Sequence, residues 1–544
     1  MDWFTSNGGW MAPTISLASV GNGAGRGLLW TAASTIEDTE TTPHVLPRGT
    51  RILHIPSHLQ LSEARSVGRL QERLGRTVWR QLWTNGLASQ RVGLDPLLRQ
   101  DIAMALDIYT LLQQPKDDTQ DCFRTGQQDE TSRTLQPTDS DDSQTSLSLL
   151  LLRPYLQEAM AAPVQRLDVW NNAEQDLLMD PFLKNTAVQS RRQLYHIWTR
   201  LIVPYMLNNN SPSSSSTTTT TQCSFEEFHR LVAAVASRAM ILQGGVKYLV
   251  PMADMMNHGH IPVQQTTTTT NDDDKKKKDT SLFTDYHVRD ETDGSITVYT
   301  DRDFVLTTTT TSIQLLEEYG QLDNSLFLTV FGFVPVDNPH HCVMMNMPTV
   351  QGTTPDMVDT VQSIWQHWGS MNTAAPETLP FPVDSVYAVC VQRNGHVVGH
   401  DPVVVQQWLA LILLFSIPLS NSNTTWQQTQ GACQDSIQDD NNDATGTILR
   451  DACFEYDGHD KMIQGYWQNV AKQQEQVFRE GHVTLEQDEQ ELDQTLLSSK
   501  EEDSRKSVDG TELNSERVAM ALRFRIEDKK VWRALAEQVQ QSSE

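Results

Sequence analysis

Apolar positions follow two different periods along the chain, and the period changes from one block to the next. Between residues 14 and 62, short apolar runs alternate with glycine and proline, as in Gly27–Trp30 and Arg51–Pro56. Short runs bounded by turn residues predict strands. Over 66–113 and 148–207, apolar residues instead recur three or four positions apart, a spacing that predicts amphipathic helices.

The second half of the chain repeats this change of period. Residues 223–240 predict a helix, with Ser224 as the N-cap and two glutamates in the first turn. Short strands are predicted within 246–343, and helices dominate from 355 onward. The final helix is predicted over 528–541, where apolar residues lie four apart.

Three polar segments interrupt these blocks, at residues 114–145, 208–221 and 264–280. Their composition cannot bury enough apolar surface to offset the entropy of ordering, so we interpret them as low-complexity surface loops. The lysine run Lys275–Lys278 lies between aspartates. A solvated loop is therefore favoured there over a nucleic-acid or targeting patch.

Composition narrows the class of protein. Only 38% of the 544 residues are hydrophobic, and the most apolar run, near residues 408–417, is too short to span a membrane. The N-terminus has no basic segment, so no signal peptide is expected. Six scattered cysteines without a C-x-x-C pair are typical of a reducing compartment and argue against a cysteine zinc cluster.

The charge balance is strongly acidic, with 42 Lys and Arg against 69 Asp and Glu and a net charge of −27. Nucleic-acid phosphates require a basic face, so no direct nucleic-acid binding is expected. Residues 433–517 hold 21 acidic and 8 basic residues and thus contribute about half of the net charge. We expect this region to attract a basic segment of a partner protein.

Two short segments offer candidate chemistry. Gly21–Gly27 alternates glycine with other residues, which allows a close approach of backbone N–H groups to a ligand. Taken alone it is a weak nucleotide motif, and a plain turn is favoured. Val250–His258 contains Asp254, Asn257 and His258, but Asn is a poor transition-metal ligand. Side chains that hydrogen-bond backbone groups are favoured there over a metal site, and no metal is predicted.

A third segment runs from Glu318 to Val334. Tyr319 precedes a glycine turn, and Asn324 comes just before an apolar run. Its simplest interpretation is a core tyrosine beside a capped helix. The chain has no G-x-S-x-G nucleophile elbow, so a serine hydrolase is not supported.

In chain order, these three segments resemble the SET-domain methyltransferases of the Rubisco large-subunit methyltransferase type. The most specific pieces are Val250–His258 (VPMADMMNH) and Tyr319–Val334 (YGQLDNSLFLTVFGFV). The stretch from Asp323 to His340 is most similar to the branch called SET domain-containing protein four. Weaker support comes from Gly49-Thr50, Ile55-Pro56, Arg153–Leu156, Val169-Trp170, Ser237–Ala239 and Ala521–Arg525.

The resemblance implies an α+β fold in two parts. A β-rich SET domain with short strands and a pseudoknot-type core is expected over 14–343, with a helical insert at about 66–240 that carries the first two low-complexity loops. A mostly helical domain similar to the Rubisco LSMT substrate-binding domain is expected over 355–541.

The resemblance also implies site residues and a cofactor. The family transfers a methyl group from S-adenosylmethionine to a protein side-chain nitrogen, usually that of lysine. Ala24, Gly25 and Arg26 would present backbone to the cofactor, and Arg238 would bind its carboxylate.

Asn257 and His258 would anchor the adenine and amino-acid parts, largely through backbone groups. Tyr319 would contact the cofactor and act as the catalytic residue at the methyl-transfer channel. Asp254 and Phe331 would line the substrate side. Many relatives have Tyr at the position of Phe331, and the missing hydroxyl is expected to change the number of methyl groups added.

Several alternatives stay open. One branch of the family methylates histidine rather than lysine, and a catalytically weak SET-fold interaction module is a further alternative. The substrate could be a histone tail, a ribosomal protein or a chloroplast enzyme. We expect a monomer with a protein substrate and no membrane association, in the cytoplasm or nucleus, with a chloroplast location also open.

Overall fold

Short strands build the first part of the chain, as the spacing over 14–62 predicts. One antiparallel sheet has the order β1-β5-β11-β10, and a second, mixed sheet has the order β2-β3-β13-β9. The strands of the first sheet are β1 (Trp10–Met11), β5 (Arg51–Ile55), β11 (Ile296–Tyr299) and β10 (His287–Arg289). Those of the second are β2 (Ile15–Ser19), β3 (Arg26–Thr31), β13 (Ser312–Glu317) and β9 (Asn257–His258).

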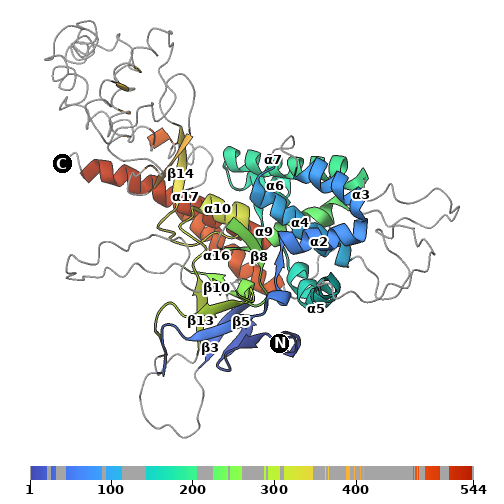
Figure 1. The fold of residues 1–544 in the computed structure, drawn as a ribbon. Helices are drawn as coiled ribbons and strands as arrows, with labels where there is room; N and C mark the ends of the chain where they lie inside the picture. The colour runs from blue at the N-terminus through green and yellow to red at the C-terminus, as the bar shows by residue number, and fades with distance from the viewer. Residues whose placement is uncertain are drawn as a thin grey trace, which may run out of the picture. The chain divides into compact units, whose positions relative to one another are not determined.

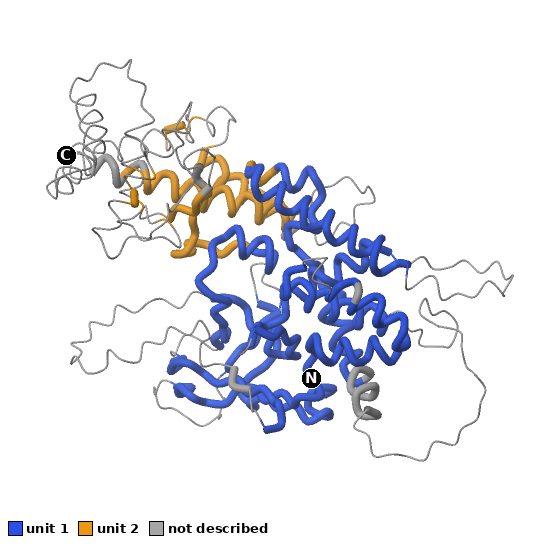
Figure 2. Tube along the Cα trace, turned by 45° about the horizontal axis from the view of Figure 1, so that its top comes forward, with its two compact units in different colours: residues 1–176, 180–333 blue, residues 177–179, 334–544 orange. Residues whose placement is uncertain are grey.

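These elements come from a computed structural model. It describes residues 2–20, 26–31, 44–88, 94–112, 142–204, 224–242, 245–259, 287–289, 292–306, 312–346, 388–392, 484–502 and 514–541, with scattered positions between 362 and 476. The chain divides into two compact units (Figure 2). Unit 1 comprises Met1–Asp176 and Asp180–Phe333, and unit 2 comprises Leu177–Met179 and Val334–Glu544.

Two smaller sheets complete the strand framework of unit 1. Strands β4 (His44–Leu46) and β12 (Phe304–Leu306) form an antiparallel pair. Strand β8 (Val246–Leu249) lies between β6 (Leu61–Ser62) and β7 (Met240–Leu242). The short strands predicted within 246–343 are confirmed.

Along the sequence, helices occupy the segment between β6 and β7, which confirms the helical insert. Figure 1 shows the helices of this insert grouped together. The short α1 (Asp2–Ser6) precedes all strands. The insert contains α2 (Glu63–Leu74), α3 (Arg76–Trp79), α4 (Pro96–Leu112), α5 (Asp142–Ala161), α6 (Asn172–Asp176), α7 (Pro181–Ile197) and α9 (Phe225–Arg238), with π-helical turns at Arg80–Leu87 and Trp198–Ile202.

Helix α4 is the buried centre of the insert. All ten side chains from Ile102 to Leu111 are buried. Its two buried carboxylates are neutralised, because Asp107 pairs with Arg69 of α2 at 2.6 Å and Asp101 pairs with Lys247 of β8 at 2.7 Å. Buried charges require such partners, so these pairs fix α4 against both α2 and β8.

Unit 2 contains two long helices, α16 (Leu485–Glu502) and α17 (Ser515–Gln541). The predicted helix over 528–541 is thereby confirmed as the end of a longer one. Asp488 of α16 is buried and pairs with both Arg525 and Lys529 of α17. This shared carboxylate holds the two helices together.

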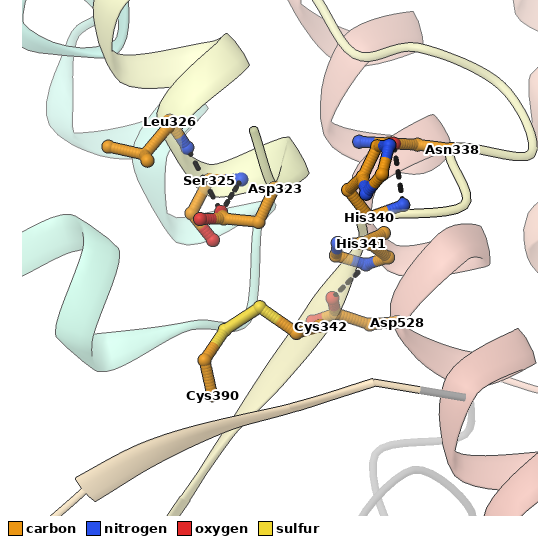
Figure 3. The surroundings of a disulfide bond; sticks show 9 residues. All are labelled: Asp323, Ser325, Leu326, Asn338, His340, His341, Cys342, Cys390 and Asp528. Carbon is orange, nitrogen blue, oxygen red and sulfur yellow. Dashed lines mark hydrogen bonds and ion pairs between the residues drawn. A yellow bond between two sulfur atoms is a disulfide. The ribbon is translucent and has the colours of Figure 1, made fainter. Parts of the chain in front are cut away.

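A strand pair in unit 2 departs from the helical prediction. Strands β14 (Cys342–Asn346) and β15 (Ala388–Gln392) are antiparallel, and a disulfide joins Cys342 to Cys390 across 48 residues of sequence (Figure 3). The expectation of reduced cysteines is wrong for this pair, since sequence spacing does not reveal that two distant strands pair. His341 Nε2 lies 2.9 Å from Asp528 Oδ1 of α17.

Within the described residues, the helices are all too short or too polar to cross a membrane.

Candidate active site

Tyr319 is fixed at two atoms just beyond the end of β13. Its hydroxyl donates a hydrogen bond to the carbonyl oxygen of Met256 at 2.6 Å, and its backbone N–H donates to His258 Nδ1 at 3.2 Å. Gly320 follows with a φ of +111°, a conformation that L side chains rarely adopt. The Y-G pair therefore turns the chain away from the strand while the tyrosine ring stays in place.

The parallel pairing of β9 with β13 brings the two specific sequence segments together. Asn257 lies opposite Leu316, and His258 lies opposite Glu317. Gly259 N–H continues the pairing by donating to the Glu317 carbonyl at 3.0 Å. The chain segment that ends the VPMADMMNH motif thus lies directly beside the strand that leads to Tyr319.

Aromatic rings surround the Tyr319 ring. The Phe331 ring centroid lies 4.8 Å away, that of His258 5.3 Å and that of Phe333 6.1 Å. Phe331 ends the π-helical turn Phe327–Phe331, which follows helix α10 (Asn324–Leu326), and Phe333 lies two residues beyond that turn. The Asp323 side chain caps this helix by accepting from the N–H groups of Ser325 and Leu326 (Figure 3), which matches the predicted capped helix.

The environment of Tyr319 keeps its hydroxyl protonated. Burial raises the pKa of Tyr319 well above its ordinary value, and the nearby carboxyls Glu317 and Asp254 raise it further. Burial also raises the pKa of Glu317 to about 8. A tyrosine in this state donates a hydrogen bond and orients a neighbour, and it does not act as a base at neutral pH.

Asp254 is the second buried centre of the site. It lies in the 3-10 turn Ala253–Met255, directly after Met252, whose φ of +71° is rare for a non-glycine residue. Its Oδ2 accepts from the Tyr155 hydroxyl at 2.6 Å and from Arg238 Nη1 at 3.4 Å. Burial raises the pKa of Asp254, although the charge of Arg238 opposes that rise.

The start of β3 approaches the same region. Asn257 Nδ2 donates to the carbonyl oxygen of Arg26 at 3.3 Å. A Cβ atom on Gly27 would lie 2.8 Å from Gln314 Nε2 and 3.0 Å from Asn257 Nδ2, so this glycine is required for close packing. Arg26 also pairs with Glu158 of α5.

The structure thus brings together seven of the nine predicted site residues. Arg26 contacts Asn257, and Arg238 contacts Asp254. Both His258 and Phe331 contact Tyr319. Ala24 and Gly25 lie outside the described residues. Asn257 and His258 each hydrogen-bond a backbone group, as the interpretation favoured over a metal site expects.

Sequence reasoning missed four contributors to this site. They are Tyr155, Glu317, Phe333 and the carbonyl oxygen of Met256. Tyr155 lies within the Arg153–Leu156 segment, so a signal was present, but its spacing gave no indication of a partner almost 100 residues away. A carbonyl oxygen leaves no trace in a sequence at all.

The solved structures that match the chain include three that are similar to it over nearly its full length. The SET domain of LSMT bound to lysine and AdoHcy is 14% identical, with a TM-score of 0.51, and the match covers 100% of this chain and 90% of that one. The SET domain of LSMT bound to MeLysine and AdoHcy is 15% identical, with a TM-score of 0.50 and coverage of 99% and 90%. Rubisco LSMT bound to sinefungin and monomethyllysine is 13% identical, with a TM-score of 0.51 and coverage of 100% and 90%.

No family model matches the sequence. No curated protein matches it either. The similarity is therefore carried by structure, at identities of 13% to 15%. The chain has an α+β architecture and adopts the SET-domain fold of Rubisco LSMT.

Proposed function

We propose that this chain is an S-adenosylmethionine-dependent protein N-methyltransferase whose acceptor is a lysine side chain. The observation that carries the proposal is the Tyr319 hydroxyl, held on the Met256 carbonyl within a ring of aromatic side chains. Two solved structures with this fold contain lysine or methyllysine together with AdoHcy, and a third contains sinefungin with monomethyllysine.

The residues around Tyr319 fit such a cofactor. Arg238 is partly exposed and uses one Nη atom toward Asp254, and a guanidinium has five N–H donors. It can therefore also bind a carboxylate. Arg26 and the close packing at Gly27 place backbone near Asn257, which suits an extended ligand. We assign Ala24, Gly25, Arg26, Asn257 and His258 to this role through their backbone groups.

Methyl transfer requires mainly that the donor and the acceptor are correctly positioned. S-adenosylmethionine supplies a methyl group on a sulfonium sulfur, and in-line attack forms the N–C bond as the S–C bond breaks. The acceptor amine must first lose a proton. A free lysine has a pKa of about 10.4, and an apolar site next to a positive charge lowers it. Aromatic faces and carbonyl oxygens, both present around Tyr319, suit the cationic sulfonium group.

Asp254 and Phe331 are assigned to the acceptor side. Asp254 has one buried oxygen, Oδ1, without a hydrogen-bond partner among the described residues. A substrate group that donates a hydrogen bond could satisfy it. Phe331 presents an apolar ring beside Tyr319, where it would limit the space around the methylated nitrogen.

Unit 2 would recruit the protein substrate. Residues 433–517 carry 21 acidic and 8 basic residues, and in α16 the acidic side chains Glu489, Glu491 and Asp493 are exposed. A basic segment of a partner protein, for example a histone tail or a ribosomal protein, complements this charge.

The decisive experiment is transfer of a radiolabelled methyl group from S-adenosylmethionine to proteins of a cell lysate. Mass spectrometry of the labelled product then identifies the modified residue. Label on lysine supports the proposal, and label on histidine replaces it with histidine methylation. Absence of both labelling and cofactor binding by the full chain would favour the third alternative, an interaction module. The Tyr319→Phe and Asn257→Ala variants serve as the matched negative controls.

A further inference from the structure

Helix α5 of the insert contacts the site at two points. Tyr155 donates from its hydroxyl to Asp254 Oδ2 at 2.6 Å, and Glu158 pairs with Arg26 at the start of β3. The two residues are three positions apart, so they lie on one face of the helix. Helix α5 therefore contacts both Asp254, which pairs with Arg238 of α9, and the strand that follows the glycine-rich segment.

We propose that Tyr155 is a positioning residue that holds Asp254, and through it Arg238, in the orientation that the cofactor carboxylate requires. The inference rests on the proposed function, because it assigns Arg238 to that carboxylate. Tyr155 itself touches neither reactant in this assignment.

The geometry around Asp254 supports this role. The Asp254 side chain is fully buried and is bonded through Oδ2 alone among the described residues. A carboxylate held on one side can rotate about its terminal torsion, which is broad and poorly restricted. Of its two donors, Arg238 is the distant one at 3.4 Å, and the tyrosine bond at 2.6 Å is short. The hydroxyl is thus the contact that fixes the carboxylate plane.

Tyr155 is itself immobilised. Its ring is 5% exposed and stacks on the Trp3 ring of α1, with centroids 6.1 Å apart and planes inclined by 13°. The Trp3 indole N–H donates to the carbonyl oxygen of Leu151 in α5. Burial also raises the pKa of Tyr155 well above its ordinary value, so the hydroxyl keeps its proton and its donor role at neutral pH.

The test compares Tyr155→Phe with Tyr195→Phe in the full chain. Tyr195 is a matched control, because it lies in the same insert on α7 and is 50% exposed. We expect Tyr155→Phe to weaken S-adenosylmethionine binding, measured by calorimetry, by about tenfold, as the loss of one charge-assisted hydrogen bond predicts. The KM for the cofactor should rise by a similar factor, with a smaller fall in kcat, and Tyr195→Phe should match the unaltered protein.

A double substitution tests whether Tyr155 acts through Asp254. In an Asp254→Asn background, the further change Tyr155→Phe should cause no additional loss of cofactor affinity. An equal loss in both backgrounds would overturn the proposal. So would a Tyr155→Phe protein that unfolds at a lower temperature yet binds the cofactor with unchanged affinity, because Tyr155 would then only stabilise the fold.

A third measurement separates this inference from the proposed function. If the unaltered chain binds no S-adenosylmethionine, the proposed function is wrong, and Arg238 is then probed by phenylglyoxal with mass spectrometry. Faster modification of Arg238 in Tyr155→Phe than in Tyr195→Phe would still support the positioning role. Equal rates in the two variants would reject it.

Discussion

The proposed chemistry depends most on the hydroxyl group of Tyr319. Tyr319→Phe removes its hydrogen bond to the Met256 carbonyl but keeps the ring within the aromatic cluster. We expect kcat to fall about 100-fold, because a small displacement of reacting groups has effects of this size. Unfolding free energy should fall by only about 1 kcal/mol. Steady-state kinetics with urea unfolding checks both, and an unchanged kcat would contradict the assignment.

The Phe331 ring lies beside that of Tyr319, with centroids 4.8 Å apart. Under the proposed function, Phe331→Tyr would add a polar hydroxyl close to the acceptor nitrogen. We expect the variant to shift the product toward fewer methyl groups per nitrogen, since a hydroxyl in this position can bond the amine and restrict its rotation. Intact-mass analysis of the product gives the distribution. An identical distribution from both proteins would count against this role.

Glu317 makes stability depend on pH. Burial raises its folded-state pKa to about 8, above the ordinary value of 4.5. Between these values the folded state holds a proton that the unfolded state has lost, so unfolding free energy declines as the pH rises and levels off above pH 8. In Glu317→Gln this decline should be weaker. Urea unfolding at pH 5, 7 and 9 measures it, and parallel curves for the two proteins would show that Glu317 is ionised in the fold.

The family resemblance pointed to most residues of the candidate site, but not to the partners of each residue. Asn257, His258 and Tyr319 lie in the two segments that carry this resemblance, so these residues were singled out. Tyr155 was not singled out, because a tyrosine on a helix with apolar neighbours is most often a core residue. Its function comes from a hydrogen bond to Asp254, and no local pattern encodes a contact between positions so far apart.

At the scale of elements, the turn after the π-helical segment has a strict requirement for glycine. Gly332 has a φ of +80°, and a Cβ atom there would lie 2.6 Å from the backbone N of Arg166. Gly332→Ala should therefore lower the unfolding free energy by at least about 2 kcal/mol, from backbone strain plus the clash. Thermal and urea unfolding of the full chain measure the loss.

A second glycine provides a control, because its substitution by alanine should raise the unfolding free energy. Gly68 lies within α2, and a Cβ atom added there would have no neighbour within 4 Å, so Gly68→Ala should stabilise the protein by about 0.5–1 kcal/mol through helix propensity. If Gly332→Ala left stability unchanged or raised it as Gly68→Ala does, the assigned conformation of the turn at Gly332 would be wrong.

Elements were predictable where their cause is local. The strand β5 and the helix α9 follow from apolar spacing and turn residues within their own segments. The parallel pairing of β9 with β13 could not be foreseen from spacing, because two residues form β9 and its register depends on a strand more than 50 positions later. The β14–β15 pair and its disulfide were missed for the same reason.

At the scale of the whole molecule, the net charge of −27 is unevenly distributed along the chain. The role of the most acidic region in binding a substrate can be tested. The triple variant Glu489→Gln, Glu491→Gln, Asp493→Asn neutralises exposed carboxylates of α16. We expect a basic substrate to bind it several-fold more weakly at about 0.05 M salt and almost equally at about 0.5 M, because screening shortens the range of exposed charges.

The control for this variant is Glu72→Gln, which removes an exposed carboxylate from α2 in unit 1. If recruitment depends on total charge, the loss of substrate affinity for each removed carboxylate should be the same in both proteins, because the long-range field sums over the molecule. If it depends on the acidic region, only the α16 variant should lose affinity and the slope of affinity against salt should flatten there alone. Substrate affinity and salt slope that are unchanged in the triple variant would leave the acidity of this helix without a role in recruitment.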